Sequence, residues 1–465
     1  MRKTKIICTI GPATESYDML KKMAEAGMNI VRLNMSHGDH ESHAKVIKAI
    51  KTLNKELRYP IPIMLDTQGP EIRTGTLKHD LELKQGDVIT VSVRLEDVES
   101  SSLYINYRDL INDVKIGDKI TVDNGIINLE VLEKLDRIMR CKVLDGGLMK
   151  SKRHVNLPGI RVNLPAITAK DRDDILFGVA EEVDFIALSF VREADDIRKL
   201  RKLLGSKADK IKIIAKIEDQ EGVKNLEEIV AEADGVMVAR GDLGVEINIE
   251  DLPNVQRTIV RLCHEQGKRV IVATHLLESM IENPIPTRAE VTDVANAVYE
   301  EVDAIMLSGE STIGKHPLKC VEYLDRISRT AEQAAGLRFC EKLICNNNKQ
   351  HLAVSAVQLA ESLQAPGIVV ITRRGVMANF VTNCRPTKTN IYAFTNDSRT
   401  RRQMNLNRAV VPHRLAFSSD PEKTLLTAFD ILKRDEGFKT GDQVVVISDI
   451  ISGLDVDSIQ IRVVP

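Results

Sequence analysis

The chain lacks tryptophan, and aromatic residues make up only 3 % of its 465 residues. Few rings are therefore available to stack on nucleotide bases. A surplus of charge is also missing, because 65 Lys and Arg residues stand against 67 Asp and Glu residues, for a formal net charge of −2. Without a positive field or aromatic platforms, we expect no binding to nucleic acid.

Long hydrophobic runs are absent as well. Apolar runs such as Ile211 to Ile217 are far shorter than the roughly 20 residues that cross a bilayer, so we expect no membrane span. The start, Met1-Arg-Lys followed by apolar residues to Ile10, imitates a signal peptide only faintly, because it merges into a strand pattern. We therefore do not expect secretion.

The seven cysteines have neither a CxxC pattern nor a Cys/His spacing. Such scattered thiols are typical of a reducing compartment and argue against a disulfide framework or a zinc site. The prediction is a cytoplasmic protein. With 43 % hydrophobic and 28 % charged residues, the composition is that of an ordinary globular chain, and the length suggests about three domains.

Short apolar runs alternate with amphipathic stretches, stop near residue 70 and resume near residue 165. The apolar runs do not alternate with polar residues, which indicates parallel strands covered on both faces. The predicted strands are Lys5 to Ile10, Asn29 to Asn34, Ile61 to Leu65, Val183 to Phe190, Ile211 to Ile217, Gly235 to Arg240, Arg269 to Thr274 and Ala304 to Ser308. Residues 1–70 and 165–335 together are close to the roughly 250 residues of an eight-fold α/β barrel, so an α/β (β/α)8 TIM barrel is predicted.

Two further units are predicted. The insertion, residues 71–164, contains alternating runs and an Asp123-Asn124-Gly125 hairpin signal, which indicates a small all-β lid domain. Residues 336–465 mix helical patterns, such as Glu422 to Arg434, with apolar strands, such as Gln443 to Ser448. That mixture predicts a C-terminal α/β domain for regulation or oligomerisation.

Polar residues follow nearly every predicted barrel strand, and in a barrel these strand ends meet on one face, where the active site lies. Each residue alone could simply cap a helix. Capping does not explain the whole set, which is Asn34, Ser36, Asp66, Thr67, Ser189, Lys216, Glu218, Arg240 to Asp242, Thr274, Ser308 and Glu310.

Lys216 and Glu218 are separated by one residue in a predicted strand, so both side chains point into the same pocket. Glu218 and Asp242 offer hard oxygen ligands without His or Cys, a donor set that favours Mg²⁺ or Mn²⁺ over zinc. A plain Lys216/Glu218 ion pair is the structural alternative.

Two other segments at the strand ends are suited to charged ligands. The glycines of Arg240-Gly-Asp-Leu-Gly let backbone amides approach an anion, although a plain turn would also use them. At the second strand end lie Arg32, Asn34, Ser36 and His37, which with Asp66 and Thr67 suit a monovalent cation or form an ordinary hydrogen-bond network. Fixed charges of both signs fit the transfer of a phosphoryl group between two anions, which needs positioning and charge neutralisation.

Several longer segments of the sequence are distinctive. They are Cys8-Thr-Ile-Gly-Pro-Ala, Asn29-Ile-Val-Arg-Leu-Asn-Met-Ser-His-Gly, Leu65-Asp-Thr-Gln-Gly-Pro-Glu-Ile-Arg-Thr-Gly, Asn156-Leu-Pro-Gly, Ala215-Lys-Ile-Glu, Met237-Val-Ala-Arg-Gly-Asp-Leu-Gly, Leu277-Glu-Ser-Met-Ile, Pro286-Thr-Arg-Ala-Glu, Asp293-Val-Ala-Asn-Ala-Val and Met306-Leu-Ser-Gly-Glu. These segments closely resemble the pyruvate kinase family. The resemblance runs in order through residues 1 to about 335 and more loosely to the C-terminus.

The resemblance implies the reaction of phosphoenolpyruvate with ADP to give pyruvate and ATP, the last step of glycolysis. It implies Glu218 and Asp242 as Mg²⁺ (or Mn²⁺) ligands, and Asn34, Ser36, Asp66 and the Thr67 carbonyl as a K⁺ site. Glu71 is the residue type that accompanies a K⁺ requirement in the family. The implied substrate contacts are Arg32, Lys216, Gly241, Asp242 and Thr274, the proton-donor side is that of Thr274 and Ser308, and the nucleotide contacts are Asn34, His37, Arg73 and Arg153.

The C-terminal domain departs most from the family pattern. Thr372-Arg-Arg-Gly lacks most hydroxyls of a loop that cradles a phosphate in relatives activated by fructose 1,6-bisphosphate, and Asp455 and Asp457 would repel a bisphosphate. We therefore predict weak or no activation by that compound. A sugar monophosphate or a nucleotide could still bind to a group of basic residues, which are Arg373, Arg374, Arg399, Arg401 and Arg402. The alternative is that these arginines simply form a basic face exposed to solvent. Family membership also implies a homotetramer.

Two other functions are compatible with part of this pattern. A metal-dependent enolate lyase or aldolase on the same barrel would share Glu218 and Asp242 but would need neither K⁺ nor ADP. A catalytically silent scaffold would keep the fold without the chemistry, and the presence of Lys216, both metal ligands and Thr274 argues against it.

Overall fold

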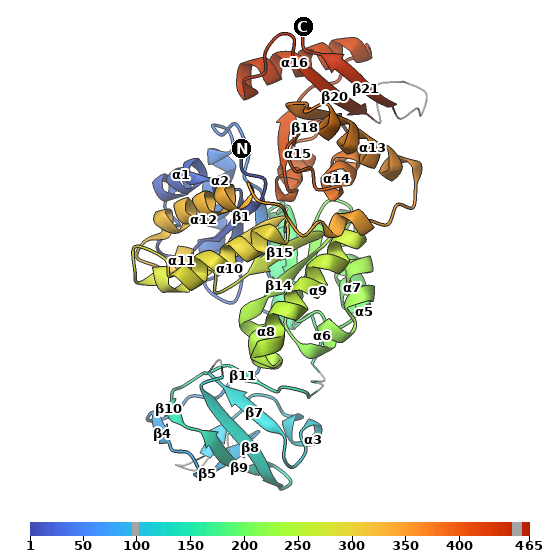
Figure 1. Cartoon of the computed structure of the whole chain (residues 1–465). Coiled ribbons are helices and arrows are strands. Elements are labelled where there is room, and N and C mark those ends of the chain that lie inside the picture. The colour runs from blue at the N-terminus through green and yellow to red at the C-terminus, as the bar shows by residue number, and fades with distance from the viewer. Residues whose placement is uncertain (95–101, 124, 161, 163, 449–457) are drawn as a thin grey trace.

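Eight parallel strands close into a barrel at the centre of the computed structural model (Figure 1). The structure describes residues 1–94, 102–123, 125–160, 162, 164–448 and 458–465. All the predicted barrel strands are present, and the first strand pairs with the last. They are β1 (Lys5–Thr9), β2 (Ile30–Asn34), β3 (Ile63–Asp66), β12 (Phe185–Leu188), β13 (Lys212–Ile217), β14 (Gly235–Ala239), β15 (Arg269–Ala273) and β16 (Ala304–Leu307).

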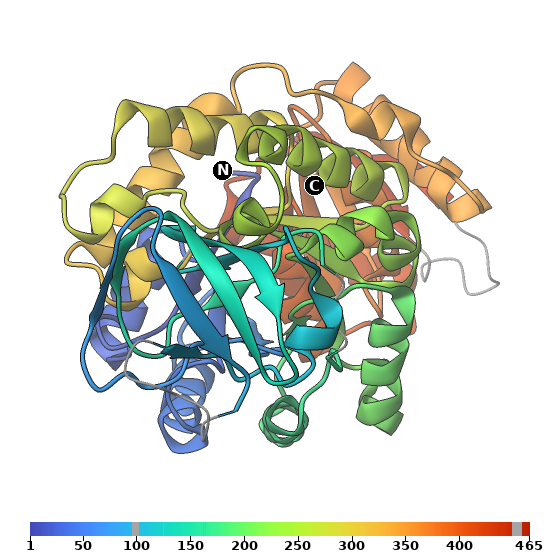
Figure 2. The ribbon, with the colours of Figure 1, turned by 90° about the horizontal axis from the view of Figure 1, so that it is seen from below.

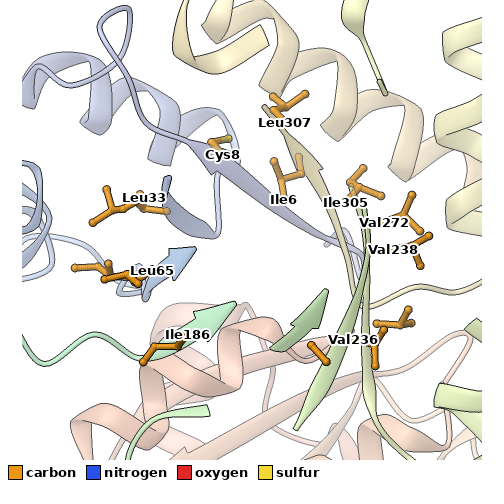
Figure 3. Packing of buried hydrophobic residues seen from close by; sticks show 14 of the residues in the cluster. Ile6, Cys8, Leu33, Leu65, Ile186, Val236, Val238, Val272, Ile305 and Leu307 are labelled. Atoms are coloured by element: carbon orange, nitrogen blue, oxygen red, sulfur yellow. The ribbon is translucent and has the colours of Figure 1, made fainter. Parts of the chain in front are cut away.

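The barrel strands are apolar because both of their faces are covered. Side chains such as Ile6, Cys8 and Val236 point outward from the strands and pack under the surrounding helices (Figure 3). Their neighbours in sequence, such as Ile7 and Met237, fill the barrel interior. Burial of alternate residues on opposite faces explains why these strands read as continuous hydrophobic runs.

Helices surround the barrel and begin and end at residues suited to those positions. In α1, for example, the Ser16 side chain accepts a hydrogen bond from the Met19 amide, and Gly27 ends the helix at φ 121°. The barrel helices are α1 (Tyr17–Ala26), α2 (His40–Leu53), α4 (Ala169–Ala180), α5 (Ala194–Leu204), α6 (Gln220–Lys224), α7 (Leu226–Glu232), α8 (Arg240–Glu246), α9 (Leu252–Glu265), α10 (Arg288–Tyr299), α11 (Gly309–Thr312) and α12 (Pro317–Ala331).

The insertion after β3 folds as a small β domain with its own hydrophobic core, as predicted. It projects from the end of the barrel where the strands finish, and Figure 2 views the molecule from this side. The predicted hairpin joins β7 and β8, which pair antiparallel with Val122 opposite Ile127, while its Asn124 lies outside the described residues. The elements are β4 (Leu81–Leu83), β5 (Val88–Ser92), β6 (Ser102–Tyr104), α3 (Leu110–Asp113), β7 (Lys119–Val122), β8 (Ile127–Lys134), β9 (Ile138–Asp145), β10 (Gly147–Met149) and β11 (Val155–Asn156).

The C-terminal domain is a five-stranded sheet with helices on both faces, packed against the opposite end of the barrel (Figure 1). Its elements are α13 (Asn348–Ser362), β17 (Gly367–Ile371), α14 (Val376–Asn383), β18 (Asn390–Thr395), α15 (Ser398–Gln403), β19 (Val410–Arg414), α16 (Pro421–Glu436), β20 (Gln443–Ser448) and β21 (Ser458–Val463). The α/β fold agrees with the sequence, which did not reveal α14, α15 and β19. The limits 1–70, 71–164, 165–335 and 336–465 of the three units stay predictions.

Arginines from the C-terminal domain hold it to the barrel. Arg385 is buried and donates two hydrogen bonds of 2.7 Å to Asp303, at the start of β16. Arg402, on α15, forms an ion pair with the buried Asp184 of the barrel. Because both arginines pair with buried carboxylates, these contacts fix the position of the C-terminal domain on the barrel. None of the described helices is long and apolar enough to cross a membrane.

Candidate active site

Lys216 stands at the centre of the carboxyl-terminal strand ends. Its Nζ atom lies 2.9 Å from Asp66 Oδ1, 2.8 Å from Glu218 Oε1 and 2.7 Å from Ser189 Oγ. Lys216 and Glu218 therefore point into the same pocket, as the alternation of β13 predicts, and they form the ion pair that was the structural alternative. Asp66 joins it from β3, a strand that is 150 residues away in sequence.

Arg32 extends this network from β2. Its Nε donates a 2.6 Å hydrogen bond to the second oxygen of Asp66, and its Nη1 donates to Thr9 Oγ1 at 2.9 Å. Asp66 is fully buried and lies between two cations, one on each carboxylate oxygen. We call Arg32, Asp66, Lys216, Glu218 and Asp242 the charged rim.

Burial and neighbouring charges set the pKa values in the charged rim. Burial alone would lower the pKa of Lys216, but the Asp66 and Glu218 carboxylates outweigh it and hold that pKa above its usual value. Burial would raise the pKa of Asp66, and Arg32 and Lys216 instead hold it below the usual value. Burial raises the pKa of Glu218 to about 7 against the attraction of Lys216, and the Asp242 carboxylate adds to the rise.

Asp242 is the one carboxylate of the charged rim without a hydrogen bond or ion pair among the described residues. It lies in the first turn of α8, so the Arg240-Gly-Asp-Leu-Gly segment begins a short helix and is neither an extended loop nor a plain turn. No cluster of three His, Cys, Asp or Glu side chains suited to a metal occurs in the described part of the chain. Glu218 and Asp242 still fit a hard divalent cation that takes water and substrate oxygens as further ligands.

Thr274 has a strained backbone beside the start of α8. Both Thr274 and His275 have positive φ values, 67° and 54°, which are rare for residues with a side chain. Arg240 stabilises this corner, because its Nη2 donates to the Thr274 carbonyl at 2.7 Å while the guanidinium binds both oxygens of Asp293. The Thr274 hydroxyl accepts a 2.7 Å hydrogen bond from the Gly241 amide.

Ser308 follows β16, at the end of the strand that closes the barrel. Its Oγ is buried and has no hydrogen-bond partner among the described residues. The buried Glu310 accepts hydrogen bonds from the amides of Ser308, at 2.8 Å, and Leu277, at 3.0 Å. One carboxylate thus holds together the two corners that carry Ser308 and Thr274.

A cavity of about 330 Å³ lies between the rim and the inserted domain. Of the residues predicted for substrate, nucleotide and metals, it is lined by Arg32, Asn34, Ser36, His37, Thr67, Arg73, Arg153, Lys216, Glu218 and Asp242. Gly241, Thr274 and Ser308 are not among its lining residues, and neither is Asp66, which is covered by Arg32 and Lys216.

The structure also gives contacts to groups for which the sequence predicted no specific role. Ser189 bridges Lys216 to the Thr67 carbonyl, to which it donates at 2.6 Å, and Thr9 accepts from Arg32. Both are polar residues at a strand end, a signal that was visible in the sequence for Ser189. The Phe190 amide, which donates to Glu218 Oε2 at 2.6 Å, carries no sequence signal because every residue has an amide.

This barrel, with its inserted domain and charged rim, defines an enzyme of the class that transfers phosphoryl groups between anions. The model of the pyruvate kinase barrel domain matches residues 1–321, and that of the pyruvate kinase alpha/beta domain matches residues 350–462. The chain therefore belongs to the pyruvate kinase family, whose members convert phosphoenolpyruvate and ADP to pyruvate and ATP and generally depend on Mg²⁺ and K⁺.

Curated relatives agree over nearly the whole chain. A chloroplastic pyruvate kinase isozyme G of Nicotiana tabacum is 44 % identical over 96 % of this chain and 80 % of its own length. The pyruvate kinase of Staphylococcus saprophyticus is 43 % identical over 97 % of this chain and 78 % of its own, and that of Geobacillus stearothermophilus is 42 % identical with the same coverage. This chain is accordingly a pyruvate kinase enzyme, and the lyase, aldolase and silent-scaffold alternatives are set aside.

Proposed function

We propose that the charged rim performs the phosphoryl transfer. Arg32 and Lys216 contact the phosphate of phosphoenolpyruvate, while the amides of Gly241 and Asp242 and the Thr274 side chain hold its carboxylate. The observation that carries this proposal is the placement of Lys216 and Arg32 on opposite oxygens of Asp66, at 2.9 and 2.6 Å. Two cations held this rigidly can stabilise charge that develops on a phosphoryl group in transit.

Glu218 and Asp242 would hold Mg²⁺ or Mn²⁺. When bound, the ion neutralises negative charge on the phosphoryl oxygens. The Asp242 carboxylate, which has no protein partner among the described residues, and the neighbouring Glu218 support this assignment. The oxygens of Asn34, Ser36, Asp66 and the Thr67 carbonyl would hold K⁺, and three of these residues line the active-site cavity.

The nucleotide would lie between the barrel and the inserted domain, which acts as a lid. Asn34, His37, Arg73 and Arg153 line the same cavity and would contact ADP there. A β-phosphate oxygen of ADP attacks phosphorus in line, and the bond from phosphorus to the enol oxygen breaks. Closure of the lid excludes water, which would otherwise compete for the phosphoryl group.

The enolate that leaves is protonated at C3 from the Thr274 and Ser308 side. The Thr274 hydroxyl donates to the Ala273 carbonyl at 2.6 Å and accepts from Gly241, so it already has both kinds of partner. Ser308 Oγ has none among the described residues. We therefore assign the relay to a water held by Ser308 and Thr274, because an unassisted hydroxyl is too weak an acid.

Initial rates of ATP formation with the two cations varied independently test this function. We expect no ATP without a divalent cation and at least about a tenfold loss without K⁺, because fixed positive charge offsets the repulsion between the two substrates. Glu71 lines the cavity and bonds Arg73 and Gln68, so Glu71→Lys should place an ammonium there and reduce the ratio of rates with and without K⁺.

Glu71→Gln is the matched control, since it removes the carboxylate charge without adding a cation, and it should retain the K⁺ dependence. Equal wild-type rates with and without K⁺ would contradict the alkali-metal site but not the kinase activity. ATP formation that needs neither cation would contradict both metal assignments.

For the C-terminal domain we propose a site for a sugar monophosphate or nucleotide, centred on Arg373 and Arg374, which are exposed. The other three arginines predicted for it bind barrel groups instead: Arg399 pairs with Glu182, Arg401 donates to the Arg58 carbonyl and Arg402 pairs with Asp184. Asp455 and Asp457 lie outside the described residues. The two exposed guanidinium groups are better suited to binding one phosphate group than the two phosphate groups of a bisphosphate.

Saturation curves for phosphoenolpyruvate test the effector site. Micromolar fructose 1,6-bisphosphate should leave the half-saturating concentration unchanged, while a sugar monophosphate or nucleotide that binds should shift it, and Arg374→Ala should remove that shift. A large shift by the bisphosphate would refute the proposal.

The family resemblance supports a homotetramer, and exposed apolar side chains such as Ile285 and Ile313 on the barrel leave surface for subunit contacts. The free, mostly buried thiols support a cytoplasmic location.

A further inference from the structure

The lid is joined to the barrel by a hydrogen bond between a buried side chain, Asn156, and a partly buried one, Glu246. Asn156, in β11 of the lid, is 3 % exposed and its Nδ2 donates at 2.8 Å to Glu246 Oε1. Glu246 is the last residue of α8, at the end of the barrel nearest the lid (Figure 1). The contact therefore links a lid strand to a helix of the barrel.

Helix α8 carries site residues at its other end. It has only seven residues, and Gly241 and Asp242 lie in its first turn. At 1.5 Å per residue, such a helix is about 10 Å long and moves as one unit. The Gln220 side chain holds the far end to the barrel by donating to the Glu246 carbonyl. The two ends of α8 thus face the substrate site and the lid.

On the lid side, Asn156 is three residues from Arg153. The two residues share one segment of chain, in which the Arg153 amide donates to Thr74 Oγ1 at 2.7 Å and Asn156 pairs with Thr121 of β7. A shift of Asn156 relative to the barrel must therefore also move Arg153, whose guanidinium lines the active-site cavity.

The surroundings of the Asn156/Glu246 hydrogen bond determine how much it contributes to holding the lid on the barrel. A cavity of about 80 Å³ lies beside it, lined by Asn156, Glu246, Asp219 and His154 together with apolar residues such as Ile72 and Phe190, so the joint is not closely packed here. Glu246 is partly buried near the Asp219 and Asp242 carboxylates, and this burial raises its pKa to about 7. Further polar ties cross this joint: the Leu157 backbone also hydrogen-bonds Glu246, and Arg192 donates to the carbonyls of Val162 and Leu164.

We propose that the Asn156/Glu246 hydrogen bond is a latch through which α8 positions the lid, and with it Arg153, over the nucleotide. Asn156 and Glu246 are positioning residues, and the inference rests on the proposed function of Arg153 and of the lid. When the latch is lost, the lid samples more open positions. ADP then binds less tightly and water reaches the phosphoryl group, while the phosphoenolpyruvate contacts within the barrel are unchanged.

Glu246→Ala and Asn156→Ala test the latch in the full-length enzyme. Each should raise KM for ADP about tenfold, the effect of one hydrogen bond to a charged group, and change KM for phosphoenolpyruvate less than about twofold. Both should increase pyruvate release without ATP formation. The double variant should be no worse than Glu246→Ala, because Glu246→Ala already removes the bond to Asn156, together with the bond to the Leu157 backbone. Glu246→Gln keeps an acceptor oxygen for Asn156 and should stay within about twofold of wild type in KM for ADP.

Asn248→Ala is the matched control, because Asn248 is close to Glu246 in sequence but bonds only Asp251 and should leave both KM values unchanged. Parallel rises in both KM values, or equal defects in Glu246→Ala and Glu246→Gln, would overturn the latch. Additive defects in the double variant would overturn it as well. Absence of ATP formation by the wild type would instead refute the proposed function.

Discussion

Replacing Lys216 by methionine should lower the rate of ATP formation about a thousandfold, while proton exchange at C3 of pyruvate stays measurable. Lys216 lies among Asp66, Glu218 and Ser189, on the phosphate side of the proposed substrate position. Loss of its charge removes transition-state stabilisation from phosphoryl transfer. In the proposed mechanism, protonation of the enolate uses the Thr274 and Ser308 side and does not require the lysine. The two half-reactions are measured by coupled ATP formation and by exchange of labelled pyruvate.

Lys212→Met is the control for this variant. Lys212 begins the same strand, β13, and its Nζ lies 3.2 Å from Asp234, far from the charged rim. It should lose little activity. Thermal unfolding must show that Lys216→Met folds, since it leaves Glu218 without its cation, although Asp66 keeps Arg32. If proton exchange were lost as completely as ATP formation, the division of roles between Lys216 and the Thr274 side would be wrong.

Asp242→Asn should reduce ATP formation about a thousandfold without destabilising the metal-free protein. The Asp242 carboxylate has no hydrogen-bond partner among the described residues, and its charge raises the pKa of Glu218. Neutralising it therefore relieves repulsion in the metal-free protein while it removes a proposed ligand of the divalent cation. The two effects have opposite signs, which separates a metal ligand from a residue that merely supports the fold.

Thermal unfolding with and without Mn²⁺ measures this difference. A cation present at a hundred times its dissociation constant stabilises the wild type by about 2.7 kcal/mol, and that gain should be much smaller in Asp242→Asn. Asp251→Asn, a change at an exposed carboxylate that follows α8, should keep both the activity and the Mn²⁺ effect. An undiminished Mn²⁺ effect in Asp242→Asn would contradict the assignment.

Much of the fold was predictable because each barrel strand carries its own signal. Runs such as Gly235 to Ala239 are apolar on both faces, so they identify buried parallel strands without any knowledge of their neighbours. The small elements α14, α15 and β19 were not recognised, since short elements give few residues for a pattern. From the sequence, Arg399, Arg401 and Arg402 were predicted to belong to a ligand site. In the structure, each of them instead bonds a residue of the barrel domain.

By itself, the sequence determined the eight strands, the inserted β domain and the delivery of Lys216, Glu218 and Asp242 to one end of the barrel. These follow from local periodicity and from the common direction of parallel strands. Tertiary structure alone decided that Asp66 pairs with Lys216 and Arg32, that Asp242 has no partner among the described residues, and that Asn156 meets Glu246. Such pairings join residues far apart in the chain, so they depend on strand register and barrel closure, which no local pattern specifies.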